Sequence, residues 1–293
     1  MNERRSDFGP SQAIFDDFVA EVWDHHRESR RDLPWRCTFD PYEILVSEIM
    51  LQQTQVARVL DKYPLFLSAF PTVAALASAD VGAVLAVWQG LGYNRRALAL
   101  YRAAKAIVEE HGGTFPDTVE GLRKLPGVGE ATAAAVSAFA FGRGQPFIET
   151  NIRAAYIHFF FPGQDGIPDA AILPLVQATI DPDDPREWFY ALMDYGVWVK
   201  RTYGNPSRRS RHHTVQSRFA GSRREVRAGV LQAVLAATPA AVEVSRLPEL
   251  LDALGRAPEE LADIADELAR EGFLEKTGTA YRIAGSAQDD ISE

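Results

Sequence analysis

LPGVGEATAAAVSAFAFG, residues 125–142, is the stretch that decides the fold. The proline and two glycines between helical patterns allow a tight turn, whose backbone N–H groups are expected to point outward. From Glu130 to Phe141 the side chains are mostly small and apolar, so this helix should lie deep in a core. A turn with outward amides at a helix start suits an anion. The alternative is an ordinary connection between two helices.

Helical patterns continue on both sides of this stretch. A capping-box-like start, Asp117 to Glu120, precedes the turn. No sustained alternation typical of β-strands occurs before residue 270, so the fold class is predicted to be all-α. Apolar spacing predicts helices over residues 12–31, 42–59, 65–70, 73–78, 81–88, 94–110, 150–161, 170–180 and 186–202.

The last part of the chain has a different pattern. Three helices are predicted over residues 223–237, 247–254 and 258–270, and a β-hairpin turning at Thr277-Gly278 follows them. Three helices and a small hairpin are typical of a winged-helix module, which we place at 223–284. Such modules often read DNA but also serve as plain interaction modules, and this copy is acidic. Residues 1–10 and 285–293 are predicted to be a flexible N-terminus and a tail.

Charge is distributed unevenly along the 293 residues. The total of −9 by itself argues against a nucleic-acid partner. However, residues 200–227 carry Lys200 and eight arginines against one acid, Glu225, a net charge of +8. We call residues 200–227 the basic belt. A one-signed, arginine-rich segment suits contacts with phosphates, and the alternative is a solvated linker.

Several classes of protein are excluded by composition. A single cysteine, Cys37, cannot form an internal disulfide, a four-cysteine iron–sulfur cluster or a structural zinc site. The histidines lack the cysteine or carboxylate neighbours of a metal site, so no metal site is predicted. No apolar run approaches the roughly 20 residues that span a bilayer, and no secretory signal begins the chain. A cytoplasmic, nucleoid-associated protein without a membrane partner is expected.

A family resemblance joins these motifs. LPGVGEATAAAVSAFAFG with PFIETNIR (146–153) resembles the helix–hairpin–helix and acidic residue of the endonuclease III superfamily of DNA glycosylases, also called HhH-GPD. Five further segments resemble its adenine DNA glycosylase branch, the MutY type. The resemblance runs in order over about residues 32–200, and the last 90 or so do not clearly share it. The five segments are DLPWR (32–36), PYEILVSEIMLQQTQVARV (41–59), FPTVAALA (70–77), WQGLGYNRRA (88–97) and HGGTFPDT (111–118).

The resemblance implies a two-lobed helix–hairpin–helix glycosylase fold over residues 11–222. A central bundle is expected at about 40–145 and a second lobe at 11–39 plus 146–222. Duplex DNA with a mispaired or damaged base, the implied partner, would lie between the two. A monomer is expected.

The resemblance also implies catalytic residues. Glu48 matches the catalytic glutamate of the adenine glycosylases, and its apolar neighbours could keep it protonated near neutral pH. Glu149 matches the superfamily's catalytic aspartate but is one methylene longer, and Asn151 could orient it or a phosphate. Ala131 stands where bifunctional members carry a Schiff-base lysine, so an enzyme without lyase activity is implied. As alternatives, Glu48 is a surface carboxylate and Glu149 a favourable acid at a helix start.

DNA contacts are implied at four places along the chain: the segment with Gln52 and Gln53, the loop at residues 90–93, the hairpin and the basic belt. The hairpin could also hold a monovalent cation through its carbonyls. In most of the branch an iron–sulfur cluster follows the segment that here reads MDYGVWV. Lys200 stands at its first cysteine position and no others follow, so the basic belt replaces the cluster loop. The predicted DNA-binding residues are Gln52, Gln53, Gly90, Gly92, Tyr93, Pro126, Gly127, Val128, Gly129, Lys200, Arg208, Arg209 and Arg211.

The expected function is therefore that of a monofunctional DNA glycosylase in base excision repair. It would flip a base, adenine by preference, out of the duplex and hydrolyse its N-glycosidic bond. One alternative is the excision of uracil, thymine or another damaged base from a mismatch. The other is a non-catalytic DNA-binding protein on the same scaffold, for which the change to Glu149 leaves room.

Overall fold

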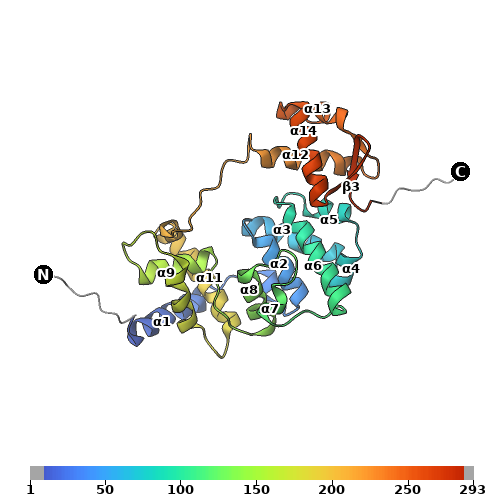
Figure 1. Cartoon of the computed structure of the whole chain (residues 1–293). Helices are drawn as coiled ribbons and strands as arrows, with labels where there is room; N and C mark the ends of the chain where they lie inside the picture. Colours follow the sequence, from blue (N-terminus) through green and yellow to red (C-terminus); the bar gives the residue numbers. More distant parts are fainter. Residues whose placement is uncertain (1–9, 287–293) are drawn as a thin grey trace. The chain divides into compact units, whose positions relative to one another are not determined.

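The computed structural model describes residues 10–286, which form two compact units (Figure 1). The first unit contains the described residues up to Leu45 together with Pro116–Arg123 and Val128–Val215. The second contains Val46–Phe115, Lys124–Gly127 and the described residues from Gln216 onward. The boundary therefore falls within α2 (Pro41–Leu51) and again within the hairpin.

Helices make up the first unit. Helix α9 packs against α11 and is aligned with it by the close approach of Gly196 to the backbone of Asn151, where a Cβ atom would lie 2.1 Å from the carbonyl oxygen. The elements are α1 (Gln12–Ser29), η1 (Pro34–Arg36), α7 (Val119–Leu122), α8 (Glu130–Phe141), α9 (Thr150–Phe160), α10 (Asp169–Thr179), α11 (Pro185–Thr202) and η2 (Pro206–Arg209).

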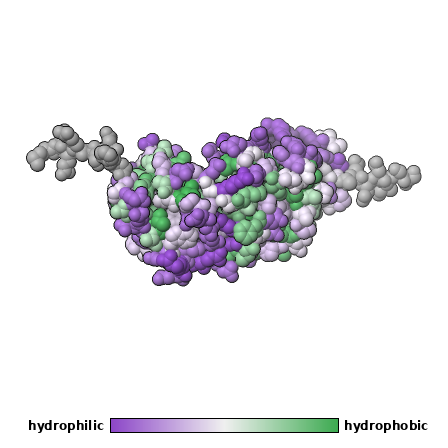
Figure 2. All heavy atoms as spheres, turned by 90° about the horizontal axis from the view of Figure 1, so that it is seen from below, coloured by the Kyte–Doolittle hydropathy of each residue, from purple (hydrophilic) through white to green (hydrophobic). Residues whose placement is uncertain are grey.

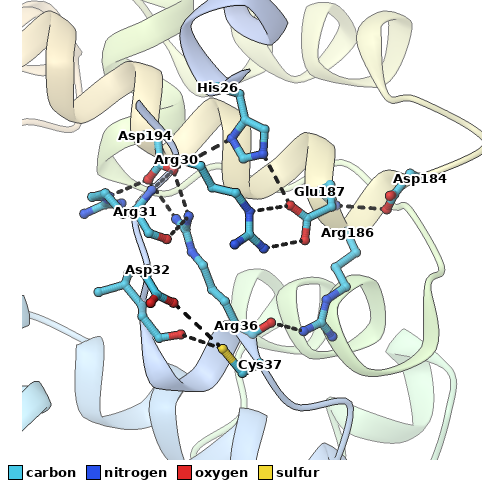
Figure 3. Close-up of polar contacts among 11 residues, drawn as sticks. His26, Arg30, Arg31, Asp32, Arg36, Cys37, Asp184, Arg186, Glu187 and Asp194 are labelled. Atoms are coloured by element: carbon cyan, nitrogen blue, oxygen red, sulfur yellow. Dashed lines mark hydrogen bonds and ion pairs between the residues drawn. The ribbon is translucent and has the colours of Figure 1, made fainter. Parts of the chain in front are cut away.

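A buried ion cluster ties α1 and η1 to α11 (Figure 3). The Asp194 carboxylate accepts two hydrogen bonds from Arg36, at 2.7 and 2.8 Å, and both side chains are only 1% exposed. Arg31 donates to the same carboxylate through its side chain and its backbone amide. Glu187, about two helical turns earlier, accepts from Arg30 and lies 3.3 Å from His26 Nε2. The cluster fixes residues 26–36 on α11.

The second unit combines a helical bundle with the C-terminal module. Helices α5 and α6 pack together, and α4 packs on α6. The bundle contains α3 (Val56–Ala69), α4 (Val73–Ala77), α5 (Val81–Trp88) and α6 (Arg95–His111). The module contains α12 (Arg223–Ala237), β1 (Val242–Glu243), η3 (Val244–Arg246), α13 (Leu247–Leu250), η4 (Asp252–Leu254), α14 (Pro258–Glu271), β2 (Leu274–Thr277) and β3 (Ala280–Ile283).

The module has the helices and the hairpin expected of a winged helix. Its antiparallel sheet has the order β1-β3-β2, with Val242 opposite Tyr281 and Leu274 opposite Ile283. It packs on α5, where a Cβ atom on Gly82 would lie 3.3 Å from Ile283 Cγ2. Module and bundle therefore belong to one compact unit.

Most of the predicted helices are confirmed within one or two residues, and the all-α class with its C-terminal module is confirmed. The single helix predicted over 42–59 was wrong, because the chain turns at residues 52–55 between α2 and α3. The segment predicted as a helix over 65–70 is the end of α3. Strand β1 was missed because two residues cannot show alternation. The domain boundaries stay a prediction, and most of the predicted flexible ends lie outside the described residues.

Surface polarity agrees with a protein whose apolar residues are mostly buried. Hydrophilic residues spread over most of the face shown in Figure 2, with smaller hydrophobic patches between them. Among the described residues, none of the helices is long and apolar enough to cross a membrane.

Candidate functional site

The hairpin depends on Gly127. Its φ of +75° is a left-handed conformation that favours glycine, and a Cβ atom there would lie 2.5 Å from the Cβ of Ala99. Gly129 precedes α8 as its N-cap, and a Cβ atom there would meet nothing within 4 Å. Within residues 10–286 the amides of Gly127 and Gly129 have no hydrogen-bond partner in the protein. The turn thus has two unpaired N–H donors at a helix start, and the anion site there stays a prediction.

Glu48 lies on α2, in the second unit. It is half-buried, whereas Ser47, Ile49 and Met50 around it are buried. Its role as a proton donor stays a prediction.

Arg96 joins two predicted DNA-contacting segments, the turn after α2 and the loop before α6. Its guanidinium donates to the carbonyls of Ile49 and Met50 at 3.0 and 2.9 Å, and to that of Gln52. It also donates to the carbonyl of Gly92 at 2.9 Å, to the carbonyl of Leu91 and to the hydroxyl of Thr54. Burial lowers the pKa of Arg96 to about 10. A single side chain therefore sets the position of Gln52 relative to the loop.

The loop itself has an unusual backbone. Gly90, Gly92 and Tyr93 have φ values of +91°, +72° and +48°, and Gln53 in the neighbouring turn has +54°. These conformations favour glycine and are uncommon for Tyr and Gln. Strained residues of this kind cluster at functional sites.

Tyr93 also contacts the basic belt. Its hydroxyl accepts a hydrogen bond of 2.8 Å from Arg224, which donates in addition to the Ser217 carbonyl at 2.7 Å. The last part of the belt, from Gln216 onward, is thereby held at the loop within the second unit.

Glu149 is the N-cap of α9, in the first unit. Its Oε1 accepts from the amides of Asn151 and Ile152 at 2.7 and 2.8 Å, and its Oε2 accepts from the Asn151 side chain at 3.1 Å. Lys200 donates to the Asn151 side-chain oxygen at 2.8 Å. Burial lowers the pKa of Lys200, although the charge of Glu149 partly offsets this. The network fixes the orientation of the carboxylate.

Two residues of the basic belt serve the fold of the first unit. Lys200 is half-buried in the network around Asn151. Arg209 donates to the carbonyls of Ile157, Phe161 and Gln164. Arg208 and Arg211 are exposed and stay candidates for contacts with DNA phosphates.

The segment after α11 is held by contacts of its own side chains and backbone. Besides the bonds of Arg209, Tyr203 stacks on His158 at 4.5 Å, and Ser210 pairs with Ile167 in an isolated bridge. In the described part of the chain, no group of three or more His, Cys, Asp or Glu side chains could hold a metal ion. Four thiolates for an iron–sulfur cluster do not exist in a sequence with one cysteine, so the residues present do not fit that cofactor.

The predicted residues thus fall into two groups. Glu48, Gln52, Gly90 and Gly92 lie in the second unit with Tyr93, whereas Glu149, Asn151 and Lys200 lie in the first. Sequence reasoning missed Arg96, which lies inside a recognised motif, because nothing local reveals an arginine that binds distant carbonyls.

Comparison with known proteins identifies the region that carries this geometry. Residues 46–177 match the model of the HhH-GPD superfamily base excision DNA repair protein. Adenine DNA glycosylase of Mycolicibacterium smegmatis is 37% identical over 182 residues, which are 61% of this chain and 62% of that protein. The human enzyme is 37% identical over 196 residues, which are 62% of this chain and 36% of that protein. The Mycobacterium tuberculosis enzyme is 46% identical over 129 residues, which are 44% of this chain and 42% of that protein.

The chain therefore spans about one third to two thirds of the length of these relatives. Among solved structures, a thermostable thymine-DNA glycosylase has a TM-score of 0.57 at 27% identity, covering 63% of this chain and 86% of the other. A trapped covalent endonuclease III–DNA intermediate has a TM-score of 0.54 at 18% identity, covering 73% of this chain and 93% of the other. At this identity the similarity indicates a shared fold only. The resemblance to adenine DNA glycosylases is confirmed. Residues 46–177 are therefore similar in sequence to the HhH-GPD domain of base excision DNA repair proteins.

Proposed function

We propose that this protein is a DNA glycosylase that excises adenine from mispaired or damaged duplex DNA. The observation that carries the proposal is the match to adenine DNA glycosylases from bacteria and humans. The family match over residues 46–177 includes Glu48. Those relatives are longer than the aligned part, so the substrate of this chain needs its own test.

Glu48 acts as the general acid in this proposal. A purine leaves more easily when its ring nitrogen is protonated, and a half-buried carboxyl among apolar neighbours can hold the required proton. Glu149 carries the negative charge that stabilises the oxocarbenium-like sugar. Its three hydrogen bonds support this role, since an anion already oriented by its surroundings costs no reorganisation in the transition state.

The reaction ends with hydrolysis of the N-glycosidic bond. Ala131 cannot act as a nucleophile, so no Schiff base forms at that position and the backbone is not cut in the same step. DNA is held without an iron–sulfur cluster, through the hairpin amides and the exposed arginines of the basic belt.

A second candidate is the excision of thymine or uracil from a mismatch. The structural similarity to a thymine-DNA glycosylase, at a TM-score of 0.57, favours it. A pyrimidine leaves with less need for an acid, so this function would depend on Glu149 more than on Glu48.

One assay separates the candidates. Duplexes with A·8-oxoguanine, A·G, G·T, G·U or hypoxanthine are incubated with the protein and then treated with alkali. We expect strand breaks after alkali only, in the duplexes that contain mispaired adenine. Breaks confined to G·T or G·U would favour the second candidate, and binding without any product would favour the non-catalytic alternative.

Variants test the two carboxylates separately. Glu48→Gln and Glu149→Gln should each lower the single-turnover rate by about 100-fold or more. Glutamine keeps a side-chain oxygen that can accept hydrogen bonds from the amides at the start of α9. Glu149→Gln therefore removes the negative charge but keeps the helix cap. Glu43→Gln, on the same helix as Glu48, is the matched control and should keep the rate. Strong cleavage by Glu149→Gln would contradict the role assigned to that residue.

A further inference from the structure

A pocket of about 370 Å³ in the second unit is lined by both the hairpin and the C-terminal module. Arg95 and Arg102 come from α6, and Gly127 comes from the hairpin. Arg270 and Glu271 come from the end of α14, and Phe273 follows them. Three guanidinium groups thus surround one carboxylate beside the turn that carries unpaired amides.

The charge of Glu271 is already balanced by Arg95 and Arg227. Its carboxylate accepts from Arg95 Nε at 2.9 Å and from Arg95 Nη2 at 2.5 Å, and from Arg227 Nη2 at 2.6 Å. These hydrogen bonds, with that of Arg95 the strongest influence, hold the pKa of Glu271 below its ordinary value. The positive charges of Arg102 and Arg270 are therefore left without a carboxylate of their own among the described residues.

Arg102 is held in place by backbone rather than by charge. Its Nη2 donates to the Glu271 carbonyl at 2.7 Å, and a Cβ atom on Gly272 would come within 2.6 Å of that nitrogen. Gly272 has a φ of +87°, a left-handed conformation in which a side chain is disfavoured. The end of α14 is thus shaped to receive Arg102.

Arg270 is more loosely held. Its Nε lies 3.4 Å from the Asp266 carbonyl, and the side chain is exposed. Two exposed arginines, with Gly127 and the apolar Phe273 in the same lining, form a suitable site for a phosphate.

We propose that this pocket binds a backbone phosphate of duplex DNA through Arg102 and Arg270, next to the phosphate held by the hairpin. The inference rests on the proposed function for its choice of DNA rather than another polyanion. It gives the acidic C-terminal module a part in DNA binding through the end of α14. The rest of that helix exposes Glu259 and Asp263, which would repel a phosphate.

The test compares the double variant Arg102→Ala/Arg270→Ala with Arg246→Ala. Arg246 is an exposed arginine of the same module that does not line the pocket. Binding of a fluorescent 25-base-pair duplex without damage is measured at several salt concentrations. The double variant should bind about tenfold more weakly. Its log–log salt slope should fall by about 1, as one lost phosphate contact predicts, and Arg246→Ala should match the parent protein.

Three outcomes would overturn the proposal. One is an equal loss of affinity in the double variant and in Arg246→Ala, which would mean a general charge effect. Another is an unchanged slope in a double variant whose melting temperature equals that of the parent. The third is stabilisation by millimolar inorganic phosphate that the double variant lacks while its duplex binding is unchanged, which would assign the pocket to a free anion.

The same variants separate this proposal from the proposed function. At saturating A·8-oxoguanine duplex, Arg246→Ala should keep the excision rate of the parent protein. If the parent excises no base at all, the proposed function fails, whereas binding to undamaged duplex still decides the role of the pocket.

Discussion

Arg96 shows how one residue can organise a site without taking part in chemistry. It donates to backbone carbonyls on both sides of the turn that follows α2 and to the loop before α6. Those carbonyls belong to segments with left-handed residues, Gln53 and Tyr93, that offer few regular hydrogen bonds. The planar guanidinium, with five donors in one fork, can satisfy them where lysine could not.

Arg96→Ala should therefore destabilise the protein by about 2–4 kcal/mol, because several half-buried carbonyls lose their partner. Urea denaturation followed by circular dichroism measures this. Excision should fall further than stability explains, since the turn carrying Gln52 is no longer fixed. Arg58→Ala, an exposed arginine on α3, is the control. Equal stability of the two variants would show that Arg96 is not a positioning residue.

At the scale of elements, the junction of α1, η1 and α11 depends on buried charge. Burial alone would raise the pKa of Asp194, but the hydrogen bonds and charges of Arg36 and Arg31 outweigh it and hold that pKa below its ordinary 3.8. Such a carboxylate is ionised in the folded protein at a pH where the unfolded chain already takes up a proton. The stability it contributes is complete above about pH 4 and is lost as pH falls through the lowered pKa.

Asp194→Asn should lower the free energy of unfolding at pH 7 by about 3–5 kcal/mol, because Arg36 keeps a buried charge without its partner. Below pH 4 the variant should lose stability less steeply than the parent protein, since it lacks the carboxylate that must be protonated. Denaturation curves from pH 3 to pH 7 measure both effects.

Asp165→Asn, at an exposed position of the same unit, should reproduce the parent curve. If the free energy of unfolding of Asp194→Asn falls with pH as steeply as that of the parent protein, groups other than Asp194 set the stability at low pH.

The elements also show what sequence patterns could predict. The helices Glu130–Phe141 and Arg223–Ala237 were predicted to the residue, because apolar spacing and flanking glycines or serines act locally. The break after α2 could not be predicted. It contains neither proline nor glycine, and Arg96, more than 40 residues away, holds its carbonyls.

The candidate site divides in the same way. Glu48 and Glu149 could be named because short motifs surround them, whereas their placement in different units depends on the whole fold. Arg209 was predicted to contact DNA because it lies in an arginine-rich segment. Its three backbone acceptors come from residues 45 or more positions earlier, which composition does not reveal.

At the scale of the whole molecule, the net charge is negative although the basic belt has an excess of positive charge. Part of that positive charge is paired within the fold. In the basic belt, Arg223 and Arg227 form ion pairs with Glu267 of α14. Arg224 is bound to Tyr93. Arg201, Arg208, Arg211 and Arg218 are exposed, so they are the residues on which an interaction with phosphates depends.

Arg208→Ala/Arg211→Ala should reduce the log–log salt slope of DNA binding by about 2, because two phosphate contacts are lost, without changing the melting temperature. Arg209→Ala should instead lower the melting temperature and leave the salt slope unchanged, since its guanidinium donates to carbonyls within the fold. Fluorescence anisotropy and thermal melting on the same samples measure both. An unchanged slope in the double variant would make the belt a linker.

The last prediction concerns the union of the C-terminal module with the bundle. Gly82 on α5 is the contact point, where a methyl group would approach Ile283 to 3.3 Å and Leu235 to 3.9 Å. Gly82→Ala adds a residue with better helix propensity at a tight but adjustable contact, so the two parts should stay packed. Gly82→Leu adds three more carbons where no space exists and should force the module from α5.

The exposed residues 211–220, which lead into the module, report its release. Limited trypsin digestion should cut at Arg211 or Arg218 several times faster in Gly82→Leu than in the parent protein, because a detached module no longer holds this segment through Arg224 and Tyr93. Ala83→Leu, the exposed neighbour on the same helix, is the matched control and should digest like the parent. Digestion of Gly82→Leu at the parent's rate, with unchanged binding to DNA, would mean that the module does not depend on α5 for its position.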